Sequence, residues 1–272
     1  MFFFEILKAI FFGIVEGVTE WLPVSSTGHM LLAEELLHLD MSDSFYRVFE
    51  VVIQLGAVAA VAVRYREKLS PFGKTTEQRR ETAALWRVTA IGVIPSAIIG
   101  ALLDDVIERL FYTPTVVAIM LLLYGVGFIA AEIINRKRAP SVTSLSQIDN
   151  KKAVLVGLFQ TLSLIPGTSR SGATILGAYI CGASRTVATE FSFLLAIPTM
   201  LGAGLLRGVK FLAEGNRVEP SELVILAVGI ATAYLVSRIA VDFLTDFVSR
   251  RGFLAFGIYR IILGGALLWF FF

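Results

Sequence analysis

Two similar stretches of the chain read Gly13-Ile-Val-Glu-Gly-Val-Thr-Glu-Trp-Leu-Pro-Val-Ser-Ser-Thr-Gly-His29 and Gly157-Leu-Phe-Gln-Thr-Leu-Ser-Leu-Ile-Pro-Gly-Thr-Ser-Arg-Ser-Gly172. Each begins with Gly, has Glu or Gln three residues later, is broken by a Pro and continues into a Ser/Thr cluster that includes a Gly. Charged and hydroxyl-bearing side chains are costly inside apolar segments, so we interpret them as functional. Their duplication indicates that two halves of the protein meet at this site.

The composition indicates a polytopic helical membrane protein. Of the 272 residues, 56% are hydrophobic and 17% are charged, whereas a soluble domain carries about 25% charged residues. Apolar runs recur at about 20 residues, the length that crosses a hydrocarbon core of about 30 Å, while a β-barrel would show short alternating segments. Membrane lipids are therefore expected partners. The net charge of +2 argues against nucleic acid as a partner.

Six segments are predicted to span the membrane, at 48–63, 88–103, 115–134, 188–212, 223–243 and 253–272. The segments at about 5–38 and 153–182 differ, because Pro23 and Pro166 divide each of them into halves of about a dozen residues, which reach about half way across a bilayer. We expect these two segments to be re-entrant helical hairpins. Their irregular backbone is tolerated only where neighbouring helices shield it from lipid.

Loop charges predict the orientation, because short basic loops stay in the cytoplasm. The loops at 64–87 and 136–152 are rich in Lys and Arg and are separated by two spans, so both are expected inside. The loops at 34–47 and 104–109 are acidic and are expected outside. The same count places the basic loop at 207–220 outside, against the charge rule.

Each half thus has one hairpin and three spans, and this odd number inverts the second half relative to the first. We expect an all-α polytopic membrane protein of two inverted-topology repeats, each a re-entrant helical hairpin plus three transmembrane helices. The first repeat comprises 1–136, a cytoplasmic linker 137–152, and the second repeat 153–272. The hairpin tips would meet near the midplane, as in many secondary transporters.

The first break combines two carboxylates with hydroxyls and a histidine. Glu16 and Glu20 are four residues apart and share a helix face, which suits a divalent cation or an acid/base pair; a solvated helix face is the alternative. A hydroxyl beside a histidine and a carboxylate is typical of an activated nucleophile, and a Ser/Thr helix cap suits an anion. Capping with small-residue packing is the alternative for this cluster. Its residues are Ser25, Ser26, Thr27 and His29.

The second break predicts a phosphate site. Arg170 is always ionised and needs a partner inside a membrane. Around it, glycines allow close approach and hydroxyls can donate hydrogen bonds, a set that fits a phosphate. These neighbours are Gly167, Thr168, Ser169, Ser171 and Gly172. A structural ion pair between Arg170 and Glu16 or Glu20 is the alternative. In the empty protein this ion pair is compatible with a phosphate site.

Other intramembrane polar residues are weaker candidates. Three of them could face the same cavity, namely Glu50, Gln54 and Glu190. Arg238 and Arg260 lie in apolar runs and are interpreted as members of structural ion pairs, with Asp242 as the partner of Arg238. The single cysteine, Cys181, excludes an intramolecular disulfide and is expected to be a packed thiol.

Both motifs, together with Phe49-Glu-Val-Val-Ile-Gln-Leu-Gly56, closely resemble bacterial undecaprenyl-diphosphate phosphatases of the bacitracin-resistance type. The resemblance implies an integral enzyme of the bacterial inner (plasma) membrane that hydrolyses undecaprenyl diphosphate to the monophosphate carrier used in cell-wall synthesis. It implies a divalent cation (Mg or Ca) and an active site facing the extracytoplasmic side. The family's glutamate pair falls on Glu16 and Glu20, its Ser/His stretch on 25–29 and its arginine on Arg170.

We hypothesise that Ser26 attacks the terminal phosphorus while a carboxylate or His29 takes its proton. Attack by a metal-bound water is equally consistent with these residues, and His29 could instead protonate the leaving oxygen. The rival from another class is a flippase or transporter of polyprenyl phosphate. An ion-coupled solute carrier is disfavoured, because it would leave the hydroxyl–histidine cluster without a role. The oligomeric state is open, with a homodimer among the alternatives.

Overall fold

The computed structural model describes residues 2–136 and 138–271. The expected repeat limits at residues 1, 137 and 272 fall outside this range. Within it the chain folds into helices and loops, with one isolated bridge between Val142 and Ala183. An all-helical architecture is therefore confirmed.

Six helical segments of the described chain are long and apolar enough to cross a membrane, which confirms the predicted spans and a multi-pass membrane protein. The first span runs through two consecutive helices, and the other five are single helices. They are α3 (Asp43–Val52) with α4 (Gln54–Arg64), α6 (Thr76–Phe111), α7 (Pro114–Asn135), α10 (Arg185–Ala213), α11 (Pro220–Arg251) and α12 (Leu254–Phe271). The remaining elements are α1 (Phe2–Thr19), α2 (Ser26–Leu37), the short α5 (Arg66–Leu69), α8 (Asn150–Thr161), α9 (Arg170–Ile180) and 3₁₀ turns at Leu145–Gln147 and Leu162–Leu164.

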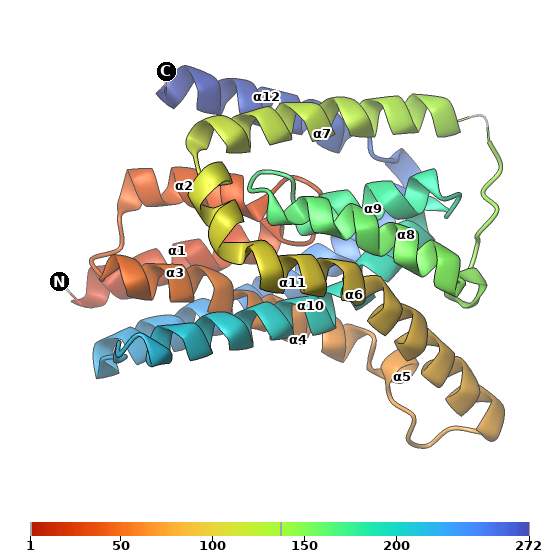
Figure 1. The fold of residues 1–272 in the computed structure, drawn as a ribbon, viewed down its shortest axis with the longest axis horizontal. Coiled ribbons are helices and arrows are strands. Elements are labelled where there is room, and N and C mark those ends of the chain that lie inside the picture. The colour runs from red at the N-terminus through yellow and green to blue at the C-terminus, as the bar shows by residue number, and fades with distance from the viewer. Residues whose placement is uncertain (1, 137, 272) are drawn as a thin grey trace.

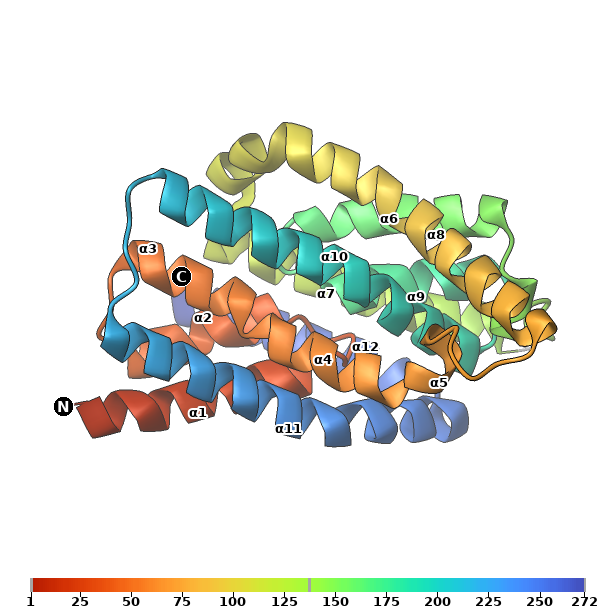
Figure 2. The same ribbon diagram turned by 90° about the horizontal axis from the view of Figure 1, so that it is seen from below.

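The helix breaks predicted at Pro23 and Pro166 are present, between α1 and α2 and between α8 and α9. Figure 1 shows that the two helix pairs enter the molecule from opposite ends and turn back at its centre. Long helices surround them on the other sides, as Figure 2 shows for α4, α6, α10 and α11. The two breaks therefore lie in the interior, where other helices cover their irregular backbone.

Glycines allow the first helix of each pair to pack closely on a long helix. A Cβ atom at Gly13 of α1 would lie 2.8 Å from the carbonyl oxygen of Gly229 in α11. A Cβ at Gly157 of α8 would lie 2.3 Å from the carbonyl oxygen of Gly92 in α6. Close backbone approach through small residues is a main source of helix association in membranes.

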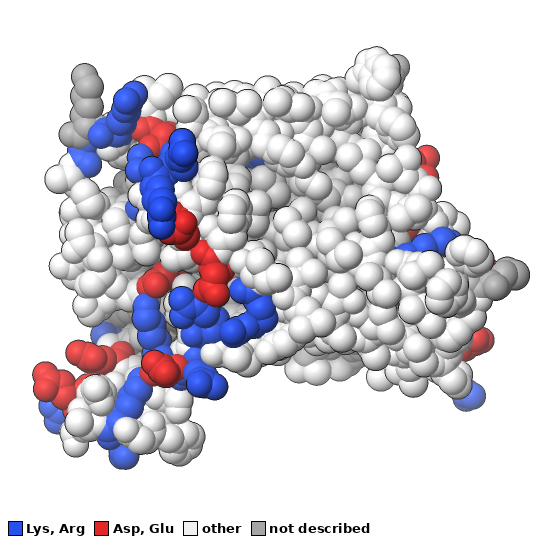
Figure 3. Space-filling view, turned by 180° about the vertical axis from the view of Figure 1, so that it is seen from behind, with Lys and Arg blue, Asp and Glu red and all other residues white. Residues whose placement is uncertain are grey.

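Charged residues gather toward the ends of the molecule and leave a broad apolar band between them (Figure 3). At one end, Arg207 lies 3.3 Å from Glu108 and Lys210 lies 2.8 Å from Asp105. These four residues lie in the last turns of α6 and α10, so the acidic stretch expected to be a loop at 104–109 is helical, as is the start of the basic stretch at 207–220. The two stretches are paired with each other at the same end of the molecule.

The expected ion pair between Arg238 and Asp242 is wrong. Asp242 instead pairs with Arg64, at 2.5 Å from Nε to Oδ1. Arg64 lies at the end of α4, which packs against α11, so a residue far away in sequence is the nearer partner. Glu190, a candidate for the central cavity, forms an ion pair with Lys68 at 2.8 Å.

Arg260 of α12 is fully buried and holds the two breaks together. Its Nη1 donates to the carbonyl oxygen of Pro23 (3.1 Å), and its Nη2 donates to those of Gly167 (2.8 Å) and Thr168 (2.9 Å). The guanidinium lies 5.4 Å from the ring centre of Tyr124. Among the described residues it has carbonyl groups, and not the expected carboxylate, as partners. Buried carbonyls need such donors, because no water is available to them.

We predict that Gly56→Ala destabilises the protein, because the added Cβ would lie 2.1 Å from the carbonyl oxygen of Ile230 in α11. Overpacking of this kind costs about 1–3 kcal/mol. The control is Gly265→Ala, where no atom of the described residues lies within 4 Å of the new Cβ. Thermal unfolding in detergent measures both. Equal melting temperatures for the two variants would contradict the close contact of α4 with α11.

Arg260→Met should destabilise the fold by about 3 kcal/mol or more, since it leaves three buried carbonyl groups without a donor. Arg251→Met, which removes an exposed arginine, is the matched control. The comparison is again made by thermal unfolding in detergent. An Arg260 variant as stable as the control would show that the two breaks do not depend on this side chain.

Candidate active site

The two breaks contact each other directly. The hydroxyl of Ser171, in the first turn of α9, donates to the carbonyl oxygen of Glu20 at 2.9 Å and lies 3.2 Å from that of Leu22. Ser25 and Ser169 cap α2 and α9 with nearly the same left-handed backbone, at φ 73° and 72°. Both capping turns therefore present the first residues of their helices to one shared centre.

Glu20 is the centre of this contact. Ser26 Oγ donates to Glu20 Oε2 at 2.7 Å, and Arg170 Nη2 donates to Glu20 Oε1 at 2.9 Å. The three residues come from the end of α1, the start of α2 and the start of α9. The structure thus brings together a hydroxyl, a carboxylate and an arginine that sequence analysis had assigned to the same site. The ion pair between Arg170 and Glu20, named as the alternative to a phosphate site, is present as well.

The guanidinium of Arg170 has a second set of partners. Its Nη1 donates to the carbonyl oxygen of Ser192 in α10 at 3.0 Å, and the ring centre of Trp21 lies 5.3 Å from its carbon. The Ser192 hydroxyl lies 2.6 Å from that of Thr174 in α9. Sequence analysis missed Ser192 and Thr174. Thr174 could have been found from its spacing, since it is one helical turn after Arg170.

Glu16 lies beside this cluster and is fully buried. Neither of its carboxylate oxygens has a hydrogen-bond partner among the described residues, and Glu20, Glu50 and Arg170 are its charged neighbours. Within that part of the chain no three His, Cys, Asp or Glu side chains lie close enough together to hold a metal ion. Two free oxygens still fit a hard cation such as Mg²⁺, which is commonly held by one or two carboxylates plus substrate phosphate.

Both ring nitrogens of His29 have partners other than Ser26. Its Nδ1 lies 2.7 Å from the carbonyl oxygen of Ser25, and its Nε2 lies 2.7 Å from the hydroxyl of Tyr259 in α12. The two rings are stacked with their centres 5.7 Å apart. Tyr259 was not found from the sequence, because it lies 230 residues from His29 and nothing local to it indicates this contact.

The remaining predicted residues support the two breaks. Gly167 has a left-handed backbone (φ 88°), and a Cβ there would lie 2.4 Å from the carbonyl oxygen of Val117 in α7. Thr168 is buried, and its hydroxyl has no partner among the described residues. Ser169 Oγ accepts from the N–H of Gly172 at 3.1 Å. Thr27, in the first turn of α2, is half-buried.

The counterpart of Glu16 in the second stretch, Gln160, makes different contacts. Its side-chain amide donates to Ser96 Oγ at 2.6 Å and to Thr199 Oγ1 at 3.2 Å. Both partners lie one residue from a proline inside a long helix, Pro95 in α6 and Pro198 in α10. The carboxylate chemistry is therefore confined to the first break, although both breaks have the same local form.

The cluster is closed to its surroundings. Only 8% of Ser26 and 6% of Glu20 is accessible, so the hydroxyl, the carboxylate and the arginine contact one another and not solvent. Electrostatic interactions are stronger in such surroundings than in water. An anionic group that reached this centre would compete with Glu20 for Arg170. Chemically, the arrangement provides a hydroxyl with a base already bonded to it and a cation beside both.

Comparison with known proteins places the chain in a family. The family model for the bacitracin resistance protein BacA matches residues 9–266. A protein of Enterococcus faecalis named undecaprenyl-diphosphatase is 49% identical over 270 residues, which cover 98% of each chain. One of Streptococcus pyogenes serotype M3, with the same name, is 50% identical over 270 residues, which cover 98% of this chain and 97% of its own. These matches span nearly the whole chain, including both breaks and all six spans, and the protein belongs to the bacitracin resistance protein BacA family.

Proposed function

We propose that this protein is an undecaprenyl-diphosphate phosphatase whose chemistry is carried out by Ser26, Glu20 and Arg170. The activity is that of its relatives at about half identity over almost the full chain. The observation that carries the assignment of residues is the Glu20 carboxylate, which binds the Ser26 hydroxyl on one oxygen and Arg170 on the other. A nucleophile, its base and a phosphate-binding cation are thereby in contact before substrate arrives.

The diphosphate first displaces Glu20 from Arg170. A phosphate offers the guanidinium two oxygens in a matching geometry, as the carboxylate does, and brings more negative charge. Glu20 then loses its cationic partner and becomes a stronger base toward the Ser26 proton. Catalysis thus begins with an exchange of partners at Arg170, and the hydrogen bond from Ser26 to Glu20 stays in place.

Ser26 Oγ attacks the terminal phosphorus while its proton moves to Glu20 Oε2 along the existing hydrogen bond of 2.7 Å. The new bond joins Oγ to phosphorus, and the bond from phosphorus to the bridging oxygen breaks. Undecaprenyl phosphate leaves, and water then releases inorganic phosphate from Ser26. Arg170 stabilises the negative charge on the transferred group.

A divalent cation, Mg²⁺ or Ca²⁺, would be held by Glu16, with Glu20 beside it. When bound, it supplies positive charge that neutralises phosphate oxygens, and it can lower the pKa of a bound water. The unpartnered oxygens of Glu16 support this assignment. His29 is positioned by Ser25 and Tyr259, and its place at the start of α2 suits it to protonate the leaving oxygen.

The membrane arrangement proposed is two inverted repeats with re-entrant hairpins, α1–α2 and α8–α9. Matching positions lie 144 residues apart, as in Gly13 and Gly157 or in Ser25 and Ser169. Helix contacts support two related repeats, because the first helix of each hairpin packs on the second span of the other repeat. In this way α1 packs on α11, and α8 packs on α6. With the basic loops in the cytoplasm of a bacterial inner membrane, the first hairpin opens to the extracytoplasmic side.

A flippase for polyprenyl phosphate is the second candidate, favoured by the approach of the two helix pairs from opposite ends. It needs the anion site at Arg170 but no nucleophile. Ser26→Ala would therefore stop phosphate release by a phosphatase, whereas lipid translocation by a flippase would stay intact.

We predict that Ser26→Ala lowers phosphate release from undecaprenyl diphosphate by about a thousandfold or more, because it removes the attacking oxygen. Arg170→Lys keeps the charge but loses the two-pronged contact, and it should reduce the rate by about a hundredfold or more. Release is measured with detergent-purified protein, and Ser221→Ala and Arg79→Lys, at exposed positions, are the matched controls. Activity that survives Ser26→Ala but not Arg170→Lys would show that water, and not Ser26, attacks the phosphorus.

Phosphate release should stop when a chelator is added and return with Mg²⁺ or Ca²⁺. Glu16→Gln should raise the metal concentration needed for half-maximal activity by at least about tenfold, because a ligand oxygen becomes a neutral amide. Glu190→Gln, which removes a carboxylate paired with Lys68 instead, should leave that concentration unchanged. An unchanged metal requirement in Glu16→Gln would exclude Glu16 as a ligand.

A further inference from the structure

A charged cavity of about 620 Å³ lies away from the two breaks. Three spanning helices end or begin at it: α7 ends at Asn135, α10 begins at Arg185 and α11 ends at Arg251. The linker after α7 and the turn after α9 form the rest of its wall. Because spanning helices end here, the cavity lies at the depth of the lipid headgroups.

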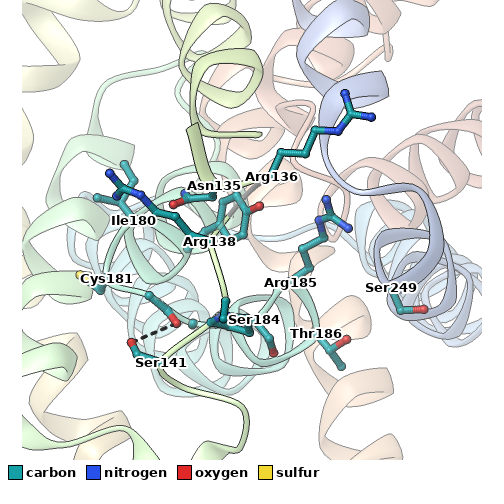
Figure 4. Close-up of a pocket in the computed structure, with 15 residues that line it drawn as sticks. Asn135, Arg136, Arg138, Ser141, Ile180, Cys181, Ser184, Arg185, Thr186 and Ser249 are labelled. Atoms are coloured by element: carbon teal, nitrogen blue, oxygen red, sulfur yellow. Dashed lines mark hydrogen bonds between the residues drawn. The ribbon is translucent and has the colours of Figure 1, made fainter. Parts of the chain in front are cut away.

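The wall of this cavity is strongly basic. It contains Arg136, Arg138 and Arg185 and no Asp or Glu side chain. Arg185 is bonded to Glu132, which stands behind the wall, whereas Arg136 and Arg138 form no ion pair within the described residues. Figure 4 shows the three arginines around the opening, at the linker and at the start of α10. Two exposed arginines that form no ion pair within the described residues favour an anion from outside the protein.

Neutral donors complete the wall. Ser141, Ser184, Thr186 and Ser249 line it, and of these the hydroxyls of Ser141 and Ser249 already donate to the carbonyl oxygens of Gly182 and Asp246. Ser184 caps α10, and its Oγ accepts from the N–H of Val187 at 3.3 Å. The N–H groups of Arg185 and Thr186, at the first positions of the helix, lack intrahelical partners, and the helix dipole adds positive potential. Hydroxyls, helix N–H groups and arginines are the donors that bind phosphate oxygens.

An exposed apolar residue lies at the wall of the cavity. Ile180, at the end of α9, lines the cavity and is 53% exposed. A ligand with a phosphate in the cavity could thus extend a hydrocarbon chain past Ile180 into the bilayer. Basic pockets between spanning helices on the cytoplasmic side typically bind anionic lipid headgroups.

We propose that this cavity binds the phosphate headgroup of an anionic membrane lipid on the cytoplasmic side. The site is separate from Ser26, Glu20 and Arg170, and it would exist whether or not the proposed catalytic mechanism is right. Two lipids share the required chemistry, a phosphate diester such as phosphatidylglycerol and a phosphate monoester such as undecaprenyl phosphate. The lipid holds the linker between the halves against α10 through Arg136 and Arg138.

Cys181 provides the means of testing this site, because it lines the cavity and is the only cysteine of the chain. It is half-buried, and burial raises the pKa of its thiol. Labelling by a maleimide at mildly alkaline pH is therefore slow but measurable. A bound headgroup would slow it further, so the labelling rate reports occupancy in the intact protein.

The experiment measures the labelling rate of purified full-length protein in detergent micelles doped with phosphatidylglycerol, phosphatidylcholine or undecaprenyl phosphate, or with inorganic phosphate alone. We expect phosphatidylglycerol or undecaprenyl phosphate to protect Cys181 and zwitterionic phosphatidylcholine not to. The variant Arg136→Gln/Arg138→Gln should need about fivefold more anionic lipid for each arginine removed. The control Arg79→Gln/Arg80→Gln removes the same charge from another basic segment and should keep the protection.

The outcomes separate the sources of the phosphate. Protection by undecaprenyl phosphate at far lower concentration than phosphatidylglycerol would assign the site to the reaction product, and the reverse would assign it to bulk lipid. Equal protection by phosphatidylcholine, or protection by anionic lipid that persists in Arg136→Gln/Arg138→Gln, would overturn the proposal. So would protection by inorganic phosphate as strong as that by the lipids. Phosphate release by both double variants, expected at the wild-type rate, checks that they fold.

Discussion

The structure depends on the satisfaction of backbone carbonyl groups at two helix breaks that lie among apolar helices. Water cannot reach these groups, so the protein must supply the donors. Arg260 does so for Pro23 in one break and for Gly167 and Thr168 in the other. One buried side chain thereby fixes the distance between the two helix pairs, and with it the positions of the capped starts of α2 and α9 that carry Ser26 and Arg170.

The two breaks share a form and differ in chemistry. Both begin with a close-packed glycine and end in a serine cap of left-handed backbone. The first contributes two carboxylates and the hydroxyl of Ser26, while the second contributes Arg170, and Gln160 replaces the carboxylate at the position matching Glu16. Opposite charges on opposite sides of the contact attract each other in the empty protein. In the proposed mechanism, a phosphate replaces Glu20 as the partner of Arg170 and leaves Glu20 free to act as a base.

The long helices separate the site from the charged ends of the molecule. Ion pairs such as Arg207 with Glu108 and Lys68 with Glu190 connect helices near the membrane surfaces, where they are partly hydrated and contribute little stability each. Unpaired arginines remain at the basic cavity around Arg136 and Arg138. Within the described residues, an occluded polar centre thus lies in the interior and an open basic cavity lies at the edge of the protein.

The sequence by itself determined the six spans, the two breaks and the residue types at the first turns of α2 and α9, because length, hydropathy and proline act locally. It also indicated Glu20, Ser26 and Arg170 as candidates, since ionisable residues are rare in apolar segments. Only the tertiary structure decided which groups touch. Arg260 donates to carbonyl oxygens and not to a carboxylate. His29 is hydrogen-bonded to Tyr259. Asp242 pairs with Arg64 and not with Arg238. Each of these partners is distant in sequence, and its position follows from how the helices pack, which no local pattern encodes.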